Sequence, residues 1–96
     1  MTAVMIARIT VKDPAKLQEY MEKTQRVAGP FGAEMMFRGK VERALNGEQD
    51  HALTVIVKFP SAQALNEWFD SDEYRPLKAL RDEGADMHMT AYTAAA

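Results

Sequence analysis

Apolar and polar residues alternate near the start of the chain, and this pattern predicts a β-strand over residues 3–11. One face of that strand carries Met5, Ala7, Ile9 and Val11, and the other carries Val4, Ile6, Arg8 and Thr10. Asp13 and Pro14 follow, and they suit the N-cap and the first turn of a helix. Because apolar residues then recur at helical spacing as far as Ala28, we expect an amphipathic helix over residues 14–28.

The same alternation predicts three further strands. The second covers residues 33–45, with a bulge or twist near Gly39, where no side chain restricts the backbone. A polar turn separates it from a third strand over residues 51–59. The last strand covers residues 85–93 and places His88 on the face opposite its methionines.

The segment over residues 61–82 predicts two helical pieces with a break between them. Ser71 suits the cap of a turn, and Pro76 lacks an N–H and starts a second helix that ends near Asp82. A helix that continued straight would leave the sheet, whereas the break returns the second piece to it. Tyr74 then closes one end of the space between helices and sheet.

The predicted order of elements is β-α-β-β-α-β, which is the ferredoxin-like arrangement of the α+β class. It gives a four-stranded antiparallel sheet in a single domain over residues 1–96, with the helices on one face. The other face mixes apolar residues such as Ile6 and Ile56 with polar ones such as Arg8 and Thr54. We expect a second copy of the chain to cover this face, giving a homodimer. Scattered surface hydrophobic residues are the alternative.

Composition and charge exclude several classes of partner and chemistry. The net charge of −2 offers no basic surface for nucleic acid or anionic lipid. The absence of cysteine excludes disulfides and thiolate chemistry. No signal-peptide pattern and no apolar run of about 20 residues is present, so we expect a cytoplasmic protein without a membrane partner.

Several short motifs resemble the DUF1330 family within the dimeric α/β-barrel superfamily. They are ITVKDP at 9–14, FRG at 37–39, VIVKFPS at 55–61, EWFDSDEY at 67–74 and the pair Leu80-Arg81. The resemblance implies a homodimer whose two sheets face each other with the helices outside. The wider superfamily includes cofactor-independent monooxygenases, haem-degrading enzymes, relatives of chlorite dismutase and muconolactone isomerases, whereas the DUF1330 branch has no agreed activity. The resemblance therefore implies the fold and the dimer rather than a reaction.

Metal and hydrolase chemistry find little support in the sequence. The histidines His51 and His88 are far apart, and no H-x-x-x-H pattern occurs, so we expect no metal and no cofactor. Either histidine as an axial haem ligand, as in some relatives, is the less favoured alternative. The serines suit helix caps, and neither a G-x-S-x-G motif nor a glycine-rich phosphate loop is present.

Arg8, Arg38 and His88 are polar candidates that the predicted registers place on the mixed face. An arginine on a covered sheet face needs a carboxylate partner or an anionic ligand. For Arg38 there are two alternatives: an ion pair with an acidic residue such as Glu42, or contact with a ligand that approaches beside Gly39. A bulge at Gly39 would move the Arg38 side chain to the opposite face of the sheet.

Two functional hypotheses remain open at this point, and whether the protein is an enzyme stays undecided. The first is a small-molecule site between helices and sheet for an anionic or carbonyl-bearing compound. Its expected lining is Tyr20, Phe37, Trp68, Tyr74 and Arg81, with Arg81 or Arg38 holding the ligand and His88, Tyr20 or Tyr74 able to move a proton without a cofactor. The second is a non-catalytic dimeric binding or structural module in which the aromatic residues are core.

Overall fold

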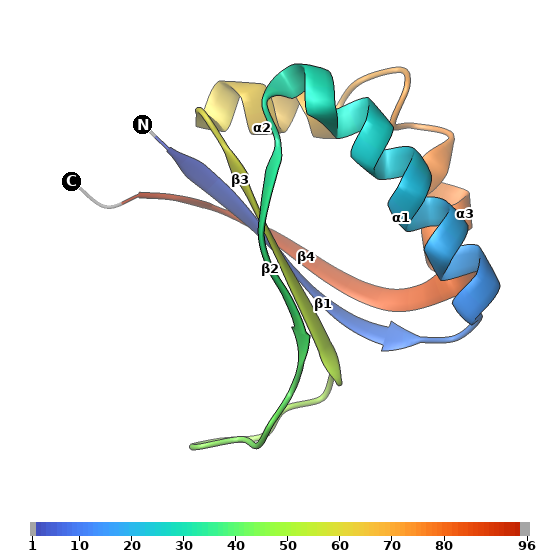
Figure 1. Cartoon of the computed structure of the whole chain (residues 1–96), viewed down its shortest axis with the longest axis vertical. Helices are drawn as coiled ribbons and strands as arrows, with labels where there is room; N and C mark the ends of the chain where they lie inside the picture. Colours follow the sequence, from blue (N-terminus) through green and yellow to red (C-terminus); the bar gives the residue numbers. More distant parts are fainter. Residues whose placement is uncertain (1, 95–96) are drawn as a thin grey trace.

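The computed structural model describes residues 2–94 and contains four strands on one side and helices on the other (Figure 1). The elements are β1 (Ala3–Val11), α1 (Pro14–Ala28), the short 3-10 helix η1 (Gly29–Phe31), β2 (Glu34–Lys40), β3 (Leu53–Phe59), α2 (Ala62–Phe69), α3 (Leu77–Gly84) and β4 (Ala85–Thr93). The strands form one antiparallel sheet in the order β2-β3-β1-β4. The predicted α+β, ferredoxin-like fold is confirmed.

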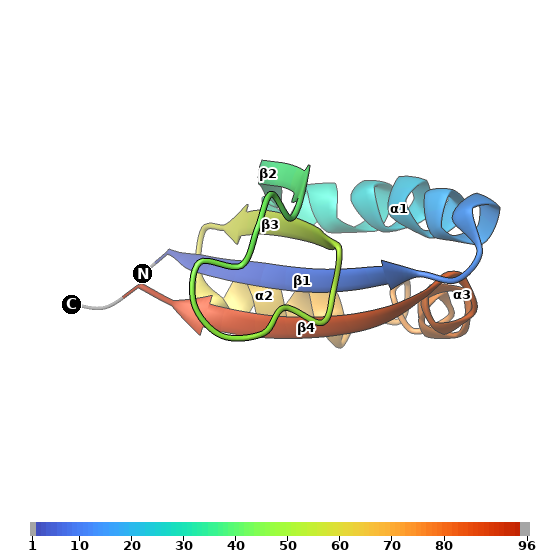
Figure 2. The ribbon, with the colours of Figure 1, turned by 90° about the horizontal axis from the view of Figure 1, so that it is seen from below.

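Alternation along β1 decides which side of the sheet is core. Ala3, Met5, Ala7 and Ile9 are buried, whereas the residues between them are partly or fully exposed. The buried face, called the inner face here, lies under the helices, and the other is the outer face (Figure 1). Figure 2 shows β1 and β4 running alongside each other, with α1 and α3 at one end of the sheet. None of the helices in the described part of the chain is both long and apolar enough to cross a membrane.

The predicted second strand is wrong in its length and in the position of its irregularity. Strand β2 ends at Lys40 rather than at residue 45, and the register shift falls between Met35 and Phe37 rather than at Gly39. Met36 is thus the extra residue of a bulge. Because side chains alternate along a strand, one inserted residue moves all those after it to the opposite face.

The bulge changes the placement of two candidate residues. Phe37 pairs with Ile56 and lies on the outer face, where it is 54% exposed. Arg38 pairs with Val55, a buried residue of the inner face. Directly opposed residues share a face of an antiparallel sheet. The expectation that Phe37 lines the space under the helices is therefore wrong, and so is the expectation that Arg38 lies on the outer face.

The predicted break between α2 and α3 is confirmed. Helix α2 ends at Phe69, and the Ser71 hydroxyl donates to the Trp68 carbonyl at 2.7 Å and accepts from the Tyr74 N–H at 3.2 Å. Pro76 is the residue just before α3, which continues to Gly84, two residues beyond the predicted end. The turn thereby turns the Tyr74 side chain inward, where it is fully buried.

Close contact between α3 and the start of α1 depends on one glycine. The Gly84 carbonyl accepts the Lys12 and Asp13 N–H groups at 2.9 and 3.0 Å. A Cβ atom at Gly84 would lie 2.7 Å from the backbone nitrogen of Leu17. Only a residue without a side chain permits this approach, which fixes α1 over the sheet.

Candidate functional site

A cavity of about 100 Å³ lies between α1 and the inner face of the sheet. Its wall is mainly apolar, and the side chains come from α1, α2 and all four strands or their ends: Met5, Ala7, Ile9, Tyr20, Met21, Thr24, Gln25, Ala28, Ala33, Met35, Val55, Val57, Phe59, Trp68, Met87 and Met89. This space is smaller than the apolar cavity of about 150 Å³ that accepts benzene in a protein core, so a ring bound here must extend toward the cavity opening. Apolar walls with a few polar groups are typical of small-molecule sites.

Two residues of the cavity wall carry buried polar atoms without a well-formed hydrogen bond among residues 2–94. They are the Oγ1 atom of Thr24 and the Nε1 atom of Trp68. Buried side-chain polar atoms are nearly always paired in folded proteins, because an unpaired one costs roughly 1–3 kcal/mol. Both residues line the cavity; the Thr24 hydroxyl also interacts with the Tyr20 phenol, whereas Trp68 Nε1 is left as an unpaired donor within the described range.

Tyr20 and Tyr74 join the cavity wall to a buried hydrogen-bond network. Their hydroxyl oxygens are 2.7 Å apart, and Arg81 Nη1 donates to the Tyr74 oxygen at 3.2 Å. The Tyr74 hydroxyl donates to Met89 Sδ, 3.8 Å away. With the Tyr74 proton on Met89, Tyr20 is the donor to Tyr74, which then accepts from both Tyr20 and Arg81. This assignment gives every proton of the two hydroxyls a partner.

The network determines the charge state of its members. Burial raises the pKa of Tyr20 far above its ordinary value of 10, and the neighbouring Tyr74 raises it further. Tyr20 is therefore a neutral phenol at physiological pH and a hydrogen-bond donor rather than a base. Arg81 has its remaining contacts with Asp82 Oδ1 at 3.1 Å and Met89 Sδ at 3.7 Å. Its guanidinium is already engaged and is not among the residues that line the cavity.

A wider groove of about 770 Å³ continues from the cavity along α1, between that helix and strands β2 and β3. Met21, Gln25 and Met35 line both spaces. Arg38 and Lys40 lie in the groove, and Arg38 forms no ion pair with any residue in the range 2–94. The Met36 bulge thus places the exposed Arg38 in the groove that adjoins the apolar cavity.

The structure divides the predicted site residues into four locations. Tyr20 and Trp68 line the cavity. Tyr74 and Arg81 form the network behind it, and Arg38 lies in the groove. Phe37 and His88 lie on the outer face, away from the cavity. The structure therefore brings Tyr20, Trp68, Tyr74 and Arg81 together and places Arg38 in the adjoining groove.

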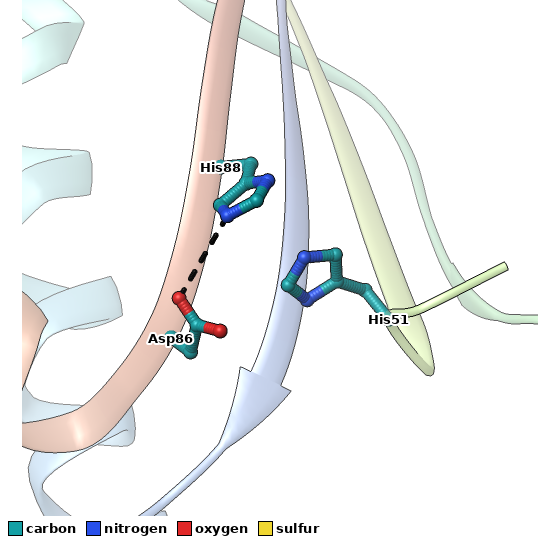
Figure 3. A group of neighbouring side chains, drawn as sticks. All are labelled: His51, Asp86 and His88. Carbon is teal, nitrogen blue, oxygen red and sulfur yellow. Dashed lines mark ion pairs between the residues drawn. The ribbon is translucent and has the colours of Figure 1, made fainter.

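Sequence reasoning missed two features that the fold brings out. Thr24 follows Tyr20 by one helical turn, so its inner position was visible in the helical spacing but its hydroxyl was not considered. His51 and His88 lie with Asp86 in one cluster on the outer face (Figure 3). Asp86 and His88 alternate on one strand and so share a face, but only the three-dimensional register brings His51 to them. Two histidines far apart in the sequence are therefore neighbours in the fold.

Solved structures of the same fold cover almost the whole chain. RPA0582, a protein of unknown function from Rhodopseudomonas palustris, is 18% identical with a TM-score of 0.79, covering 99% of this chain and 83% of that one. A dimeric ferredoxin-like protein of unknown function from Jannaschia sp. CCS1 is 8% identical with a TM-score of 0.76, covering 98% and 100%. At these identities the likeness shows the fold alone.

A further structural neighbour has a stated activity. SnoaB, a cofactor-independent oxygenase from Streptomyces nogalater, is 12% identical with a TM-score of 0.71, covering 99% of this chain and 94% of that one. No protein with a curated function matches the sequence. The profile described as "Domain of unknown function (DUF1330)" matches residues 2–95. The chain belongs to the DUF1330 family.

Proposed function

We propose that the protein binds a small, largely apolar, carbonyl-bearing compound in the cavity between α1 and the sheet. The observation that carries this proposal is Trp68 Nε1, a buried donor without a partner among residues 2–94 on a residue of the cavity wall; Thr24, whose hydroxyl also interacts with the Tyr20 phenol, lies on the same wall. An indole N–H is only a donor, and a hydroxyl both donates and accepts. A carbonyl oxygen is the simplest acceptor for the indole N–H.

The groove extends the range of ligands to those with an anionic end. A compound with its ring in the cavity would direct a substituent past Met35 toward Arg38 and Lys40. Arginine holds a carboxylate with two parallel hydrogen bonds, which adds orientation as well as affinity. Arg38 replaces Arg81 as the preferred anion-binding residue, because the Arg81 guanidinium is occupied by Tyr74, Met89 and Asp82.

A binding module is the simpler form of this proposal, and a cofactor-independent enzyme is the second candidate. Tyr20 favours the enzyme, because its hydroxyl is joined to a phenol–guanidinium chain and the residue lines the cavity. The oxygenase SnoaB has the same fold. The raised pKa of Tyr20 argues against its acting as a base, because it stays protonated at neutral pH.

We also infer that two chains pair through the outer face of the sheet. An apolar row crosses three strands there, because Phe37 and Ile6 both pair with Ile56. The helices cover only the inner face, so this row is left without a layer above it (Figure 1). The Jannaschia neighbour is described as dimeric. Packing of two such faces would bury the row and retain polar groups around it.

Calorimetric titration with acetophenone and ethylbenzene tests the binding site. The two compounds are similar in size, but only the ketone has an acceptor, so we expect it to bind more tightly by about 0.5–1.5 kcal/mol. The preference should shrink in Thr24→Val or in Trp68→Phe, each of which removes one buried polar atom from the cavity wall. Thr10→Val, on the outer face, is the matched control and should leave the preference intact. Equal affinities for both compounds, or no binding by either, would contradict the proposal.

Hydrogen–deuterium exchange at the methyl group of acetophenone separates binding from catalysis. The exchange requires removal of a proton next to the carbonyl, and NMR in D₂O follows it directly. A binding module should leave the exchange rate at that of buffer alone. Acceleration by the protein that is lost in Tyr20→Phe, with the ketone still bound, would establish the enzymatic alternative.

Sedimentation equilibrium tests the dimer. The mass should be twice the 10.8 kDa of one chain. Ile56→Glu places a charge in the proposed contact and should shift the protein toward monomer. Asn66→Glu, on the exposed side of α2, is the control and should remain dimeric. A monomeric parent protein at high concentration would refute the interface.

A further inference from the structure

Two histidines and an aspartate from separate segments meet on the outer face of the sheet (Figure 3). Asp86 and His88 are on β4, and His51 lies just before β3, on the far side of β1. One ligand atom of each residue lies within 4.8 Å of the other two. The imidazole rings of His51 and His88 are 4.5 Å apart between centroids, and His88 Nε2 is 3.9 Å from Asp86 Oδ1.

His51 is the anchored member of the cluster. Its side chain is buried, with only 7% exposure. Its Nδ1 atom lies 2.8 Å from Thr10 Oγ1. In the tautomer in which Nδ1 donates to the Thr10 hydroxyl, Nε2 is unprotonated and available as a ligand. Histidines that bind metal ions usually donate their other ring N–H to such an acceptor, which fixes both tautomer and orientation. His51 therefore has the support that a ligand histidine requires.

We propose that His51, Asp86 and His88 bind a divalent transition-metal ion, with Zn²⁺ as the representative. Two imidazoles and one carboxylate are borderline donors that suit such ions, whereas Mg²⁺ and Ca²⁺ prefer oxygen ligands alone. Bonds of about 2.0–2.1 Å in a tetrahedral site place the donor atoms about 3.3 Å apart. Ligand atoms that lie up to 4.8 Å apart must approach one another by up to about 1.5 Å to reach this spacing.

The two mobile ligands can make that adjustment. The side chains of His88 and Asp86 are 70% and 63% exposed, so rotation about their side-chain bonds meets no packed neighbour. The buried His51 keeps its place while they move toward it. Three protein ligands leave a fourth position for water, as in sites where the metal ion acts on a substrate. The ligand set is complete within one chain and is separate from the cavity on the inner face; it shares the outer face with the inferred dimer contact, and the exposures of His88 and Asp86 are those of the single chain.

A positive charge next to the cluster limits its affinity for a metal ion. Arg8 pairs with His88 across β1 and β4 and carries a positive charge on the same face. Asp86, which pairs with Thr10, supplies the opposing negative charge. Replacing Arg8 with Gln should therefore strengthen binding modestly, because it removes repulsion without touching a ligand. An ion held by other surface carboxylates would not respond to this change.

Calorimetric titration of tag-free, chelator-treated protein with Zn²⁺ tests the site. We expect saturable binding of one ion per chain near neutral pH. His88→Gln and Asp86→Asn should each weaken it more than tenfold, and both should fold because the replaced side chains are exposed. Thr10→Val should weaken it by about 10- to 100-fold, the usual effect of removing the partner of a ligand histidine. Asp72→Asn, an exposed carboxylate beside Arg75 in the turn before α3, should change nothing.

Three results would overturn the proposal. They are no saturable binding with Zn²⁺ in clear excess over the protein, binding that persists unchanged in His88→Gln, and half an ion per chain. The last result would mean that ligands come from two chains. His51→Gln is a weaker test on its own because His51 is buried, so its folding should be checked by circular dichroism.

Discussion

Replacing Tyr74 with Phe removes one oxygen atom from the core and tests whether the phenol network stabilises the fold. Tyr74 is fully buried, and its hydroxyl contacts Tyr20, Arg81 and Met89. Loss of this oxygen leaves the Tyr20 hydroxyl without its partner 2.7 Å away. Arg81 also loses an acceptor, but it retains Asp82 and Met89.

The expected magnitudes follow from these contacts. A stranded buried hydroxyl costs roughly 1–3 kcal/mol, and a hydrogen bond from a charged group adds to this. We expect Tyr74→Phe to lower the free energy of unfolding by about 2–3 kcal/mol. Tyr20→Phe should cost only about 1 kcal/mol, because Tyr74 keeps its contacts with Arg81 and Met89. In the double variant no hydroxyl is stranded, so the loss should fall short of the sum by about 1 kcal/mol.

Urea unfolding of the parent protein, the two single variants and the double variant, all at one protein concentration, measures these differences in stability. The concentration must be equal because pairing of chains would add to the apparent stability. Each kcal/mol should also shift the melting temperature by about 4–8 °C in a domain of this size. If the loss in the double variant equals the sum of the two single losses within about 0.3–0.5 kcal/mol, the two hydroxyls do not interact, and the network does not stabilise the fold as a unit.

The remaining predictions concern the backbone, the pH response and the break between helices. Gly84→Ala should destabilise by about 1–3 kcal/mol, because its methyl group would lie 2.7 Å from a backbone nitrogen of α1; Gly29→Ala, with open space around it, is the control for urea unfolding. The raised pKa of Tyr20 keeps it protonated in the folded state while the unfolded chain ionises near pH 10, so stability should fall above that pH by about 1.4 kcal/mol per unit. This slope should disappear in Tyr20→Phe but persist in Tyr92→Phe, whose ring is 46% exposed. Ser71→Ala should cost on the order of 1 kcal/mol in thermal unfolding, since its hydroxyl links the end of α2 to the next turn.

Local sequence signals predict the elements well where one or two side chains decide the backbone. Asp13 accepts the N–H groups of Ala15 and Lys16, as its place before Pro14 predicts. The break before Pro76 is equally local, because the proline lacks an N–H. The approach of Tyr20, Trp68, Tyr74 and Arg81 follows from helical spacing together with that break, and so most of the candidate site could be predicted.

Cross-strand register could not be predicted in the same way. The bulge lies at Met36 because of how β2 pairs with β3, not because of a glycine in the strand itself. That single residue moves Arg38 to the groove and Phe37 to the outer face. His51 meets His88 for a similar reason, since the pairing of three strands and the loop before β3 decides their distance. A site whose residues meet only through the register of neighbouring strands therefore cannot be predicted from one sequence.

The pleat of β1 separates the two proposed sites and makes each a control for the other. Ile9 points to the cavity, and Thr10, the next residue, supports His51 on the opposite face. Thr24→Val and Thr10→Val each remove a threonine hydroxyl, and the two hydroxyls lie on opposite sides of the sheet. If the sites are independent, the first should affect the ketone and leave Zn²⁺ binding unchanged, and the second should do the reverse. A variant that weakened both ligands would point to a general loss of structure, whereas the reciprocal pattern assigns each ligand to its own face.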